Sequence, residues 1–264
     1  MMLMDDASGE LLVERRGVSL WLTLNRPAQR NALTFAMYDG LRDVCAGVDA
    51  DSVKAVVVVG AGAKAFAAGT DMTQFRAFAS ERDALDYEAR MDAVLEAVER
   101  CPVPTVAALA GACTGGGAGI AAACDIRIAT ADLKFGFPIA RTLGNCLSIA
   151  NLARLVDLMG SGRVREMIFT GRLLGAGEAK AVGLIAEIVP DHAALLGRAE
   201  ALAELLAGHA PITLRTTKEA LRRLRLEGAK ADDRDLVLAA YMSGDFAEGR
   251  EAFLAKRAPR WKGR

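Results

Sequence analysis

Histidine is scarce in this sequence: its 264 residues include only two, His192 and His209. Histidine is a common ligand of catalytic zinc and the usual general base beside a serine or cysteine nucleophile. Both histidines lie in or near the C-terminal quarter of the chain, and each is most simply a surface or packing residue. We therefore expect no histidine-based metal site and no histidine-driven nucleophile.

Net charge and paired cysteines are also missing. Lysine plus arginine equal aspartate plus glutamate at 33 each, so no overall field attracts nucleic acid or an anionic membrane. The opening residues, MMLMDDASGE, lack the basic and apolar segments of a secretory signal. The five cysteines are odd in number and show no CxxC spacing, which is typical of free thiols in a reducing compartment: Cys45, Cys101, Cys113, Cys124 and Cys146. These features predict a cytoplasmic protein without a nucleic-acid or membrane partner.

One stretch is long enough to cross a bilayer, since residues 101–124 carry no charged side chain. Pro102, Pro104 and several glycines interrupt it, however, and most of its apolar residues are alanine. The pattern indicates a buried strand, a turn and a buried helix instead.

Common nucleotide and hydrolase motifs are absent as well. Residues 60–66, GAGAKAF, do not supply the GxxxxGK[ST] of a phosphate-binding loop. The glycines of CTGGGAGIAAACD, residues 113–125, do not fit GxGxxG, and the sequence contains no GxSxG. These absences exclude the usual dinucleotide-binding proteins, P-loop nucleotide-binding proteins and α/β-hydrolases.

Strand and helix patterns alternate over the first three quarters of the chain. Residues 53–60, VKAVVVVG, form a β-branched run typical of a strand buried on both faces. Thr34 is placed to cap a helix whose apolar residues, beginning with Met37 and Leu41, recur every three or four positions. We expect strands at 11–16, 18–25, 53–60, 103–109 and 125–130, and helices at 81–101, 195–206, 212–226 and 245–256. This order predicts an α/β core followed, after about residue 190, by a helical appendage.

Four glycines within five positions, 115–117 and 119, stand between a predicted strand and a predicted helix. Glycine lets a ligand approach the backbone closely, and the first N–H groups of a helix have no internal partner. Such a turn can hold an oxygen atom that gains negative charge during a reaction. A tight packing contact would explain the same glycines. The second glycine-rich turn after the strand at 53–60 favours the functional alternative, because two turns could each supply one N–H to a shared site.

Several ordered motifs resemble the enoyl-CoA hydratase/isomerase family, the crotonase superfamily. They are LNRPAQRNAL (24–33), GAGAKAFAAGTDM (60–72), GGGAGIAAACDIRIAT (115–130), KFGFP (134–138), FTGRLLGAGEAKAVGLIAEIVP (169–190) and the C-terminal EGREAFLAKRAPRW (248–261). The resemblance covers nearly the whole chain. It implies a spiral of repeated ββα units over residues 1–192 and a C-terminal helical region over 193–264 that assembles the chain as a homotrimer or a dimer of trimers.

The resemblance also implies site residues. The oxyanion hole that stabilises a thioester enolate would consist of the backbone N–H groups of Thr70 and Gly116. Coenzyme A would enter as part of the substrate, near the basic tail at 250–264, which has six basic side chains against one acid. The residues implied to bind the substrate are Arg26, Ala32, Ala65, Ala68, Gly69, Gly115, Ile139 and Lys256.

The chain departs from the family where hydratases carry two catalytic glutamates. Gly119 stands at the first position and Ile139 at the second, and a one-residue shift would bring Ala140 there instead. None of these side chains can act as an acid or a base. Hydration by two glutamates is therefore not expected.

Other residues are candidates to replace the glutamates. Arg141 could bind the second carboxylate of a malonyl-type substrate and so permit decarboxylation. Cys146 could act as a nucleophile, although lone cysteines are more often small buried hydrophobes. Thr142, Asn145 and Ser148 are expected near the same acyl pocket, and Glu81, Asp83 or Glu88 could project into it as a base. Asp71 and Asp125 more simply fix turns through hydrogen bonds to backbone groups.

Two classes of function remain open. The first is an acyl-CoA enzyme that stabilises a thioester enolate, with a lyase or isomerase outcome. The second is a non-catalytic relative that binds acyl-CoA.

Overall fold

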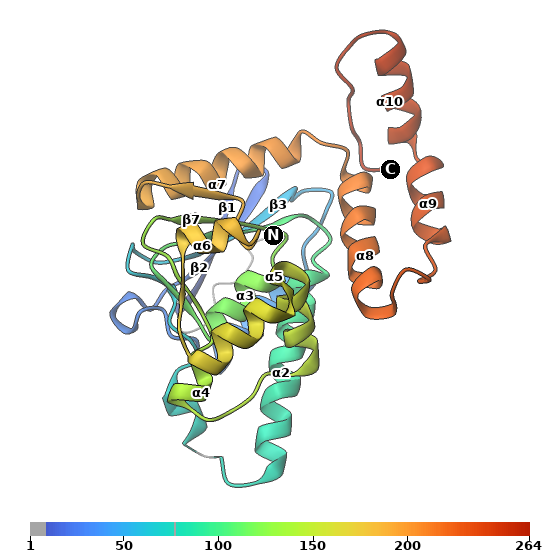
Figure 1. The fold of residues 1–264 in the computed structure, drawn as a ribbon. Coiled ribbons are helices and arrows are strands. Elements are labelled where there is room, and N and C mark those ends of the chain that lie inside the picture. The colour runs from blue at the N-terminus through green and yellow to red at the C-terminus, as the bar shows by residue number, and fades with distance from the viewer. Residues whose placement is uncertain (1–8, 77) are drawn as a thin grey trace.

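The computed structural model describes residues 9–76 and 78–264. The expectation about a secretory signal rests mainly on residues 1–8, which lie outside the described residues. The described chain forms two β-sheets surrounded by helices, with the last helices standing away from the rest (Figure 1).

The larger sheet has six strands in the order β1-β2-β3-β5-β7-β10. Strands β1 and β2 form an antiparallel hairpin through Gly17, and the other neighbours pair in parallel. The strands are β1 (Leu11–Arg16), β2 (Ser19–Leu24), β3 (Ala55–Gly60), β5 (Thr105–Leu109), β7 (Ile126–Thr130) and β10 (Glu187–Val189). The strands expected from the sequence are confirmed to within two residues at each end, and β10 ends just before Pro190, as expected.

The smaller sheet has four short strands in the order β4-β6-β8-β9. Its first three strands are parallel, and β9 is antiparallel to β8. The strands are β4 (Ala65–Ala67), β6 (Ala112–Thr114), β8 (Lys134–Gly136) and β9 (Leu174–Gly175).

The two sheets are built by a repeating unit. The pairs β3–β4, β5–β6 and β7–β8 each place one strand in the larger sheet and the next in the smaller one, and a helix follows. Those helices are α2 (Glu81–Glu99), α3 (Gly116–Ala123) and, after the short α4 (Ile139–Thr142), α5 (Ile149–Thr170). This repetition confirms the crotonase-like spiral of ββα units. The remaining helical elements are η1 (Pro27–Gln29), α1 (Phe35–Ala46), η2 (Met72–Phe75), α6 (Ala176–Ala181), α7 (His192–Ala207), α8 (Pro211–Glu227), α9 (Arg234–Tyr241) and α10 (Gly244–Leu254).

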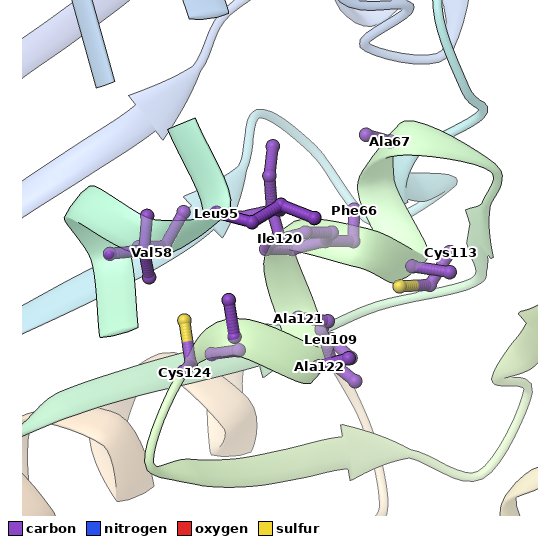
Figure 2. Packing of buried hydrophobic residues seen from close by; sticks show 14 of the residues in the cluster. Val58, Phe66, Ala67, Leu95, Leu109, Cys113, Ile120, Ala121, Ala122 and Cys124 are labelled. Atoms are coloured by element: carbon purple, nitrogen blue, oxygen red, sulfur yellow. The ribbon is translucent and has the colours of Figure 1, made fainter. Parts of the chain in front are cut away.

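Side chains that alternate along the larger sheet feed two apolar cores. Val58 and Leu109 face the core covered by α1, α2 and α3, whereas Val57 and Val106 face the core covered by α7. Figure 2 shows how Ile120 of α3 lies among Leu95, Phe66 and other buried residues of the first core. Burial on both faces explains why the β-branched run of β3 is continuous.

The division between the two regions differs from the predicted one. A boundary after residue 192 places α7 in the helical region, yet Leu195, Ala199 and Leu202 of α7 pack on the sheet as part of the second core. Helix α8 stays beside the core through its ion pair with Asp125, and α9 and α10 extend away from it (Figure 1). The amphipathic pattern of α7 does not reveal this difference, because it identifies an apolar face without showing what covers that face.

Residues 101–124 contain β5, β6 and α3, which confirms the expected buried strand, turn and buried helix. Among the described residues, no helix combines the length and apolar character needed to span a membrane. Helices α5 and α9 were not expected. Gly160 interrupts the helical conformation within α5, with a φ of 76°. The sequence of α5 therefore has no single continuous periodic pattern from which to predict the helix.

Asp125 ties the appended helix α8 to the core, and its expected structural role is confirmed. Its carboxylate accepts hydrogen bonds from the backbone N–H and hydroxyl of Thr105 at 2.7 and 2.8 Å and an ion pair from Lys218 of α8 at 2.7 Å. Replacing one side chain therefore removes three interactions that join β5, β7 and α8.

We expect Asp125→Ala to lower the free energy of unfolding by about 2 kcal/mol, because the two Thr105 donors lose their acceptor and the Lys218 ammonium group loses its ion pair. Urea denaturation measures the change. Asp51→Ala, at an exposed turn, is the control and should change stability by less than about 0.5 kcal/mol. Equal effects of the two substitutions would contradict the assignment.

Candidate active site

The two glycine-rich turns meet because they follow neighbouring parallel strands. Strand β4 pairs with β6 so that Ala67 lies opposite Cys113, and parallel strands place their carboxyl ends at the same edge. The turn at Gly69 and Thr70 follows β4, and the turn at Gly115 and Gly116 follows β6. A β-carbon built on Gly115 would lie 3.4 Å from the Gly69 Cα, so the two turns are in contact.

Glycine is required at these turns by conformation. Gly69 has a φ of 103°, and Gly115 has φ 54° and ψ −123°, both outside the range that side chains tolerate. Gly115 also donates its N–H to the carbonyl of Gly136 at 3.0 Å, which fixes the turn against β8. The bare backbone is thereby held rigidly at the N-terminus of α3.

The N–H groups of Thr70 and Gly116 are free to bind a ligand. Leu33 bonds to the residues on either side of Thr70, donating to the Gly69 carbonyl at 2.8 Å and accepting from the Asp71 N–H at 2.8 Å. The Thr70 N–H points away from this pairing. Within the described part of the chain, neither it nor the Gly116 N–H has a hydrogen-bond acceptor. The structure therefore brings together the two residues predicted to form the oxyanion hole.

Two tyrosines hold the Thr70 side chain. The Thr70 hydroxyl lies 2.8 Å from the Tyr38 hydroxyl and 3.0 Å from the Tyr87 hydroxyl. Burial raises the pKa of both tyrosines above the ordinary value, so both hydroxyls stay protonated. Tyr38 is buried and presses its hydroxyl against the Gly116 backbone, where any β-carbon would overlap it. This chain of hydroxyls fixes one proposed donor relative to the other.

A cavity of about 300 Å³ opens in front of the two N–H groups. Its walls are mainly apolar and include Leu95, Phe137 and an aromatic pair, Phe75 and Tyr87, with ring centroids 4.9 Å apart. Among the described residues, no lysine, arginine or histidine lines it. The positive end of α3 and the two N–H groups therefore supply the favourable potential for an oxyanion.

Gly119 and Ile139, where the family resemblance implies glutamates, both line the cavity. Gly119 lies one turn along α3 from Gly116, and Ile139 begins α4. Ala140 is exposed and is not part of the wall. The cavity thus has neutral side chains at both family positions.

Glu88 is the one carboxylate found in the described cavity wall. Burial, followed by the negative charge of Asp92, raises the pKa of Glu88 above its ordinary value, and a hydrogen bond from the Ser148 backbone opposes the shift. Glu81 is exposed, and Asp83 accepts the Ser80 backbone N–H at 2.8 Å in the capping box that starts α2. Of the three acids considered from the sequence, the structure brings only Glu88 to the site.

Arg141 does not reach the cavity. Its exposed side chain runs beside Gly171 at the end of α5, where a β-carbon on Gly171 would lie 3.0 Å from the Arg141 Cβ. The expectation that Arg141 faces the acyl pocket is therefore wrong: α4 turns Ile139 and Thr142 inward and Arg141 outward. Asn145 and Cys146 line the cavity as expected, whereas Ser148 does not. The other four cysteines are buried.

The residues expected to bind the substrate separate into two groups. Ala68, Gly69, Gly115 and Ile139 line the cavity. Ala32 and Ala65 lie outside it, but Ala65 lines a smaller depression together with Asn31, the neighbour of Ala32, and with Arg30 and Lys64. Binding of coenzyme A at either place stays a prediction.

Arg26 and Lys256 also lie outside the cavity. The Arg26 guanidinium pairs with Glu10 at 3.0 Å and with Asp71 at 2.8 Å, and it donates to the Ala32 carbonyl at 2.7 Å. Asp71 also accepts from the Thr73 N–H at 3.0 Å, which confirms its turn-forming role. Arg26 thus braces the turn that carries Thr70, and Lys256 follows the C-terminal end of α10.

Sequence patterns missed four polar residues of the cavity wall, Tyr38, Tyr87, Thr114 and Asn151. Tyr38 adjoins the apolar face of α1, where it is indistinguishable from a core residue. Asn151 belongs to α5, a helix that was not expected. A buried polar residue in a helix is a usable signal only once the helix itself has been recognised.

The chain matches the family model described as enoyl-CoA hydratase/isomerase over residues 15–264. It is 33% identical over 262 residues to a 2,3-dehydroadipyl-CoA hydratase of Escherichia coli, covering 97% of this chain and 99% of the relative. It is 30% identical over 251 residues to a short-chain-enoyl-CoA hydratase of Clostridium acetobutylicum, covering 94% and 95% of the two chains. The crystal structure of an enoyl-CoA hydratase/carnithine racemase from Magnetospirillum magneticum superimposes with a TM-score of 0.87 at 34% identity, covering 97% of this chain and 96% of that one.

Gly116 and Gly119, two of the three glycines of α3, should respond oppositely to alanine. Gly116→Ala should lower the free energy of unfolding by about 2 kcal/mol, because the new methyl group overlaps the Tyr38 hydroxyl. Gly119→Ala should raise it by up to about 1 kcal/mol, since the nearest atom, on Leu95, lies 3.5 Å away and alanine favours the helix. Urea denaturation compares the two variants.

Adding Tyr38→Phe to Gly116→Ala should recover part of the lost stability, because it removes the overlapping oxygen. If the double variant loses as much unfolding free energy as the two single variants together, contact with Tyr38 is not the cause of the instability of Gly116→Ala.

Proposed function

The chain belongs to the enoyl-CoA hydratase/isomerase family, and from this premise we propose that it stabilises the enolate of an acyl-CoA thioester with the N–H groups of Thr70 and Gly116. The observation that carries the proposal is the pair of unpartnered donors facing a cavity whose described wall contains one carboxylate, Glu88. Coenzyme A enters as part of the substrate, and no separate cofactor is proposed.

In the proposed reaction the thioester carbonyl oxygen accepts hydrogen bonds from both N–H groups. Glu88 takes a proton from C2, and the electron pair moves into the C1–C2 bond and onto the thioester oxygen. Each preorganised donor contributes about 3 to 4 kcal/mol of stabilisation to the resulting enolate. The burial that raises the pKa of Glu88 also makes it a stronger base toward carbon.

Isomerisation is the outcome that the site supports best. One carboxylate can remove a proton from C2 of a 3-enoyl thioester and return it to C4, which yields the 2-enoyl thioester without a further reactant. Hydration by two glutamates is disfavoured because Gly119 and Ile139 supply no acid or base. Decarboxylation of a malonyl-type substrate loses its support because Arg141 lies outside the cavity.

A lyase reaction is the second candidate, and the names of the relatives favour it. Both curated relatives described above are named hydratases. Addition or loss of water could share the same enolate and use Glu88 alone for the proton. The two outcomes differ after the first proton transfer, so that step is the one to test first.

Glu88 should control exchange of the C2 proton. In heavy water the wild type should exchange the C2 protons of butyryl-CoA, and Glu88→Gln should slow this at least about 100-fold, as expected for loss of a general base. Mass spectrometry follows the exchange. Binding of butyryl-CoA without any exchange in the wild type would favour the non-catalytic alternative, and unchanged exchange in Glu88→Gln would exclude Glu88 as the base.

The pH dependence provides a separate test of Glu88. The exchange rate should fall as the pH is lowered through a pKa above the ordinary glutamate value of about 4.3. Because its pKa is raised, the native state binds the Glu88 proton more tightly than the unfolded state does. Glu88 therefore lowers the free energy of unfolding as the pH rises from its unfolded-state pKa through its native-state pKa. Glu88→Gln should therefore unfold at a higher urea concentration than the wild type at pH 7. A less stable variant would contradict the raised pKa.

We also propose that the chain assembles as a homotrimer or a dimer of trimers through α8, α9 and α10. Helices α9 and α10 stand away from the core, and all three helices have exposed large apolar side chains on or beside them, with Met242 79% and Phe253 84% exposed (Figure 1). Others on the same helices are Leu221, Leu224, Leu238, Tyr241 and Leu254. A partner copy would cover this surface and bring its own Lys256 tail near a neighbouring chain.

Phe253→Asp combined with Leu254→Asp should shift the mass from a trimer toward a monomer, because it places two charges in the proposed interface. Size-exclusion chromatography with light scattering measures the mass. Val18→Asp, an exposed apolar position in the first hairpin, is the matched control and should leave the assembly intact. A wild-type monomer would overturn this assembly.

A further inference from the structure

Asn151 is a buried polar residue in the cavity wall with no assigned role. It lies in the first turn of α5, where its backbone N–H donates to the Ser148 hydroxyl at 3.1 Å. The residue is 8% exposed and lines the cavity. Within the described residues its buried Oδ1 has no hydrogen-bond partner. A buried carbonyl oxygen without a partner lowers stability, so a ligand that donates a hydrogen bond to it gains affinity.

The amide lies beside the acyl path from the oxyanion hole. The Asn151 Nδ2 lies 3.7 Å from where a β-carbon of Gly119 would stand. Gly119 follows Gly116 by three residues, a rise of roughly 4.5 Å along the axis of α3. A thioester carbonyl held at Gly116 would therefore direct the next two or three carbons of its acyl chain toward Asn151.

The chemistry of the amide restricts what it binds. It can accept through Oδ1 and donate through Nδ2, and its terminal torsion is broad, so it can turn toward a group that does both. A hydroxyl group fits this requirement, whereas a methylene group leaves the amide unsatisfied. Among the described residues, the cavity wall has no cation to pair with an anionic acyl group. Ser148 holds the start of α5 near the proposed base, since its hydroxyl accepts the Asn151 backbone N–H and its backbone contacts Glu88.

We propose that Asn151 binds a hydroxyl group on the acyl chain and thereby selects hydroxylated acyl thioesters over unsubstituted ones. This inference rests on the proposed function, because the acyl chain must start at the oxyanion hole. Asn151 occupies the space beside Gly119 with a neutral donor and acceptor, so it binds the oxygen without transferring a proton.

Calorimetric titration with butyryl-CoA, 2-hydroxybutyryl-CoA and 3-hydroxybutyryl-CoA tests the proposal. The wild type should bind at least one hydroxylated thioester about tenfold more tightly than butyryl-CoA. Asn151→Leu, of similar shape, should abolish the preference and leave the Kd for butyryl-CoA within about twofold. Asn145→Leu removes an exposed amide from the same cavity wall and should retain the preference.

The melting temperature without ligand distinguishes binding from a structural role. Asn151→Leu should melt at a higher temperature than the wild type, because it removes a buried group that has no partner. A structural asparagine would give the opposite shift. Asn151→Ser provides a second variant, smaller and still polar, which should retain part of the preference.

The outcomes separate this inference from the proposed function. Equal affinity of the wild type for all three thioesters, or an undiminished preference in Asn151→Leu, overturns the role of Asn151 and leaves the oxyanion hole standing. Failure of the wild type to bind any of the three overturns both. Loss of the preference in Asn151→Leu alone supports the inference.

Discussion

The parallel pairing of β4 and β6 is the constraint on which the site depends. It places the ends of two short strands at one edge, so that Thr70 and Gly116 face the same cavity although they are distant in sequence. Neither strand is long enough to be stable alone, and both derive their position from the larger sheet, to which each is joined through β3 or β5. The rigid, buried sheet of the spiral therefore fixes the positions of the two N–H groups relative to each other.

The cavity concentrates groups that would lower the stability of an ordinary protein interior. Among the described residues, two backbone N–H groups lack acceptors, Glu88 is partly desolvated, and the buried Asn151 Oδ1 has no partner. Unsatisfied polar groups persist where a ligand supplies the missing partner, and the two large apolar cores provide the stability that tolerates them. The same reasoning distinguishes the cavity from Asp125, whose carboxylate is fully engaged and therefore has a structural role.

The sequence was sufficient to predict the α/β spiral, the strands of the larger sheet and the approach of the turns that carry Thr70 and Gly116. Those features depend on local signals: β-branched runs, glycine turns and ordered motifs. The position of Arg141 could not be predicted, because one turn of α4 decides whether a side chain faces the cavity or solvent. The position of Asn151 could be predicted only once α5 was recognised. The packing of α7 could be predicted only once it was known that its apolar face covers the sheet.

The cavity wall also explains why a single substitution would not restore a glutamate at position 119. A β-carbon there would already contact Leu95 at 3.5 Å and Asn151 at 3.7 Å, so a longer side chain would have to displace one of them. A carboxylate at this place would also share a cavity of about 300 Å³ with Glu88, and two neighbouring carboxylates raise each other's pKa. The three residues are therefore mutually compatible: Glu88 carries the charge, Asn151 binds neutral oxygen, and Gly119 leaves space for both.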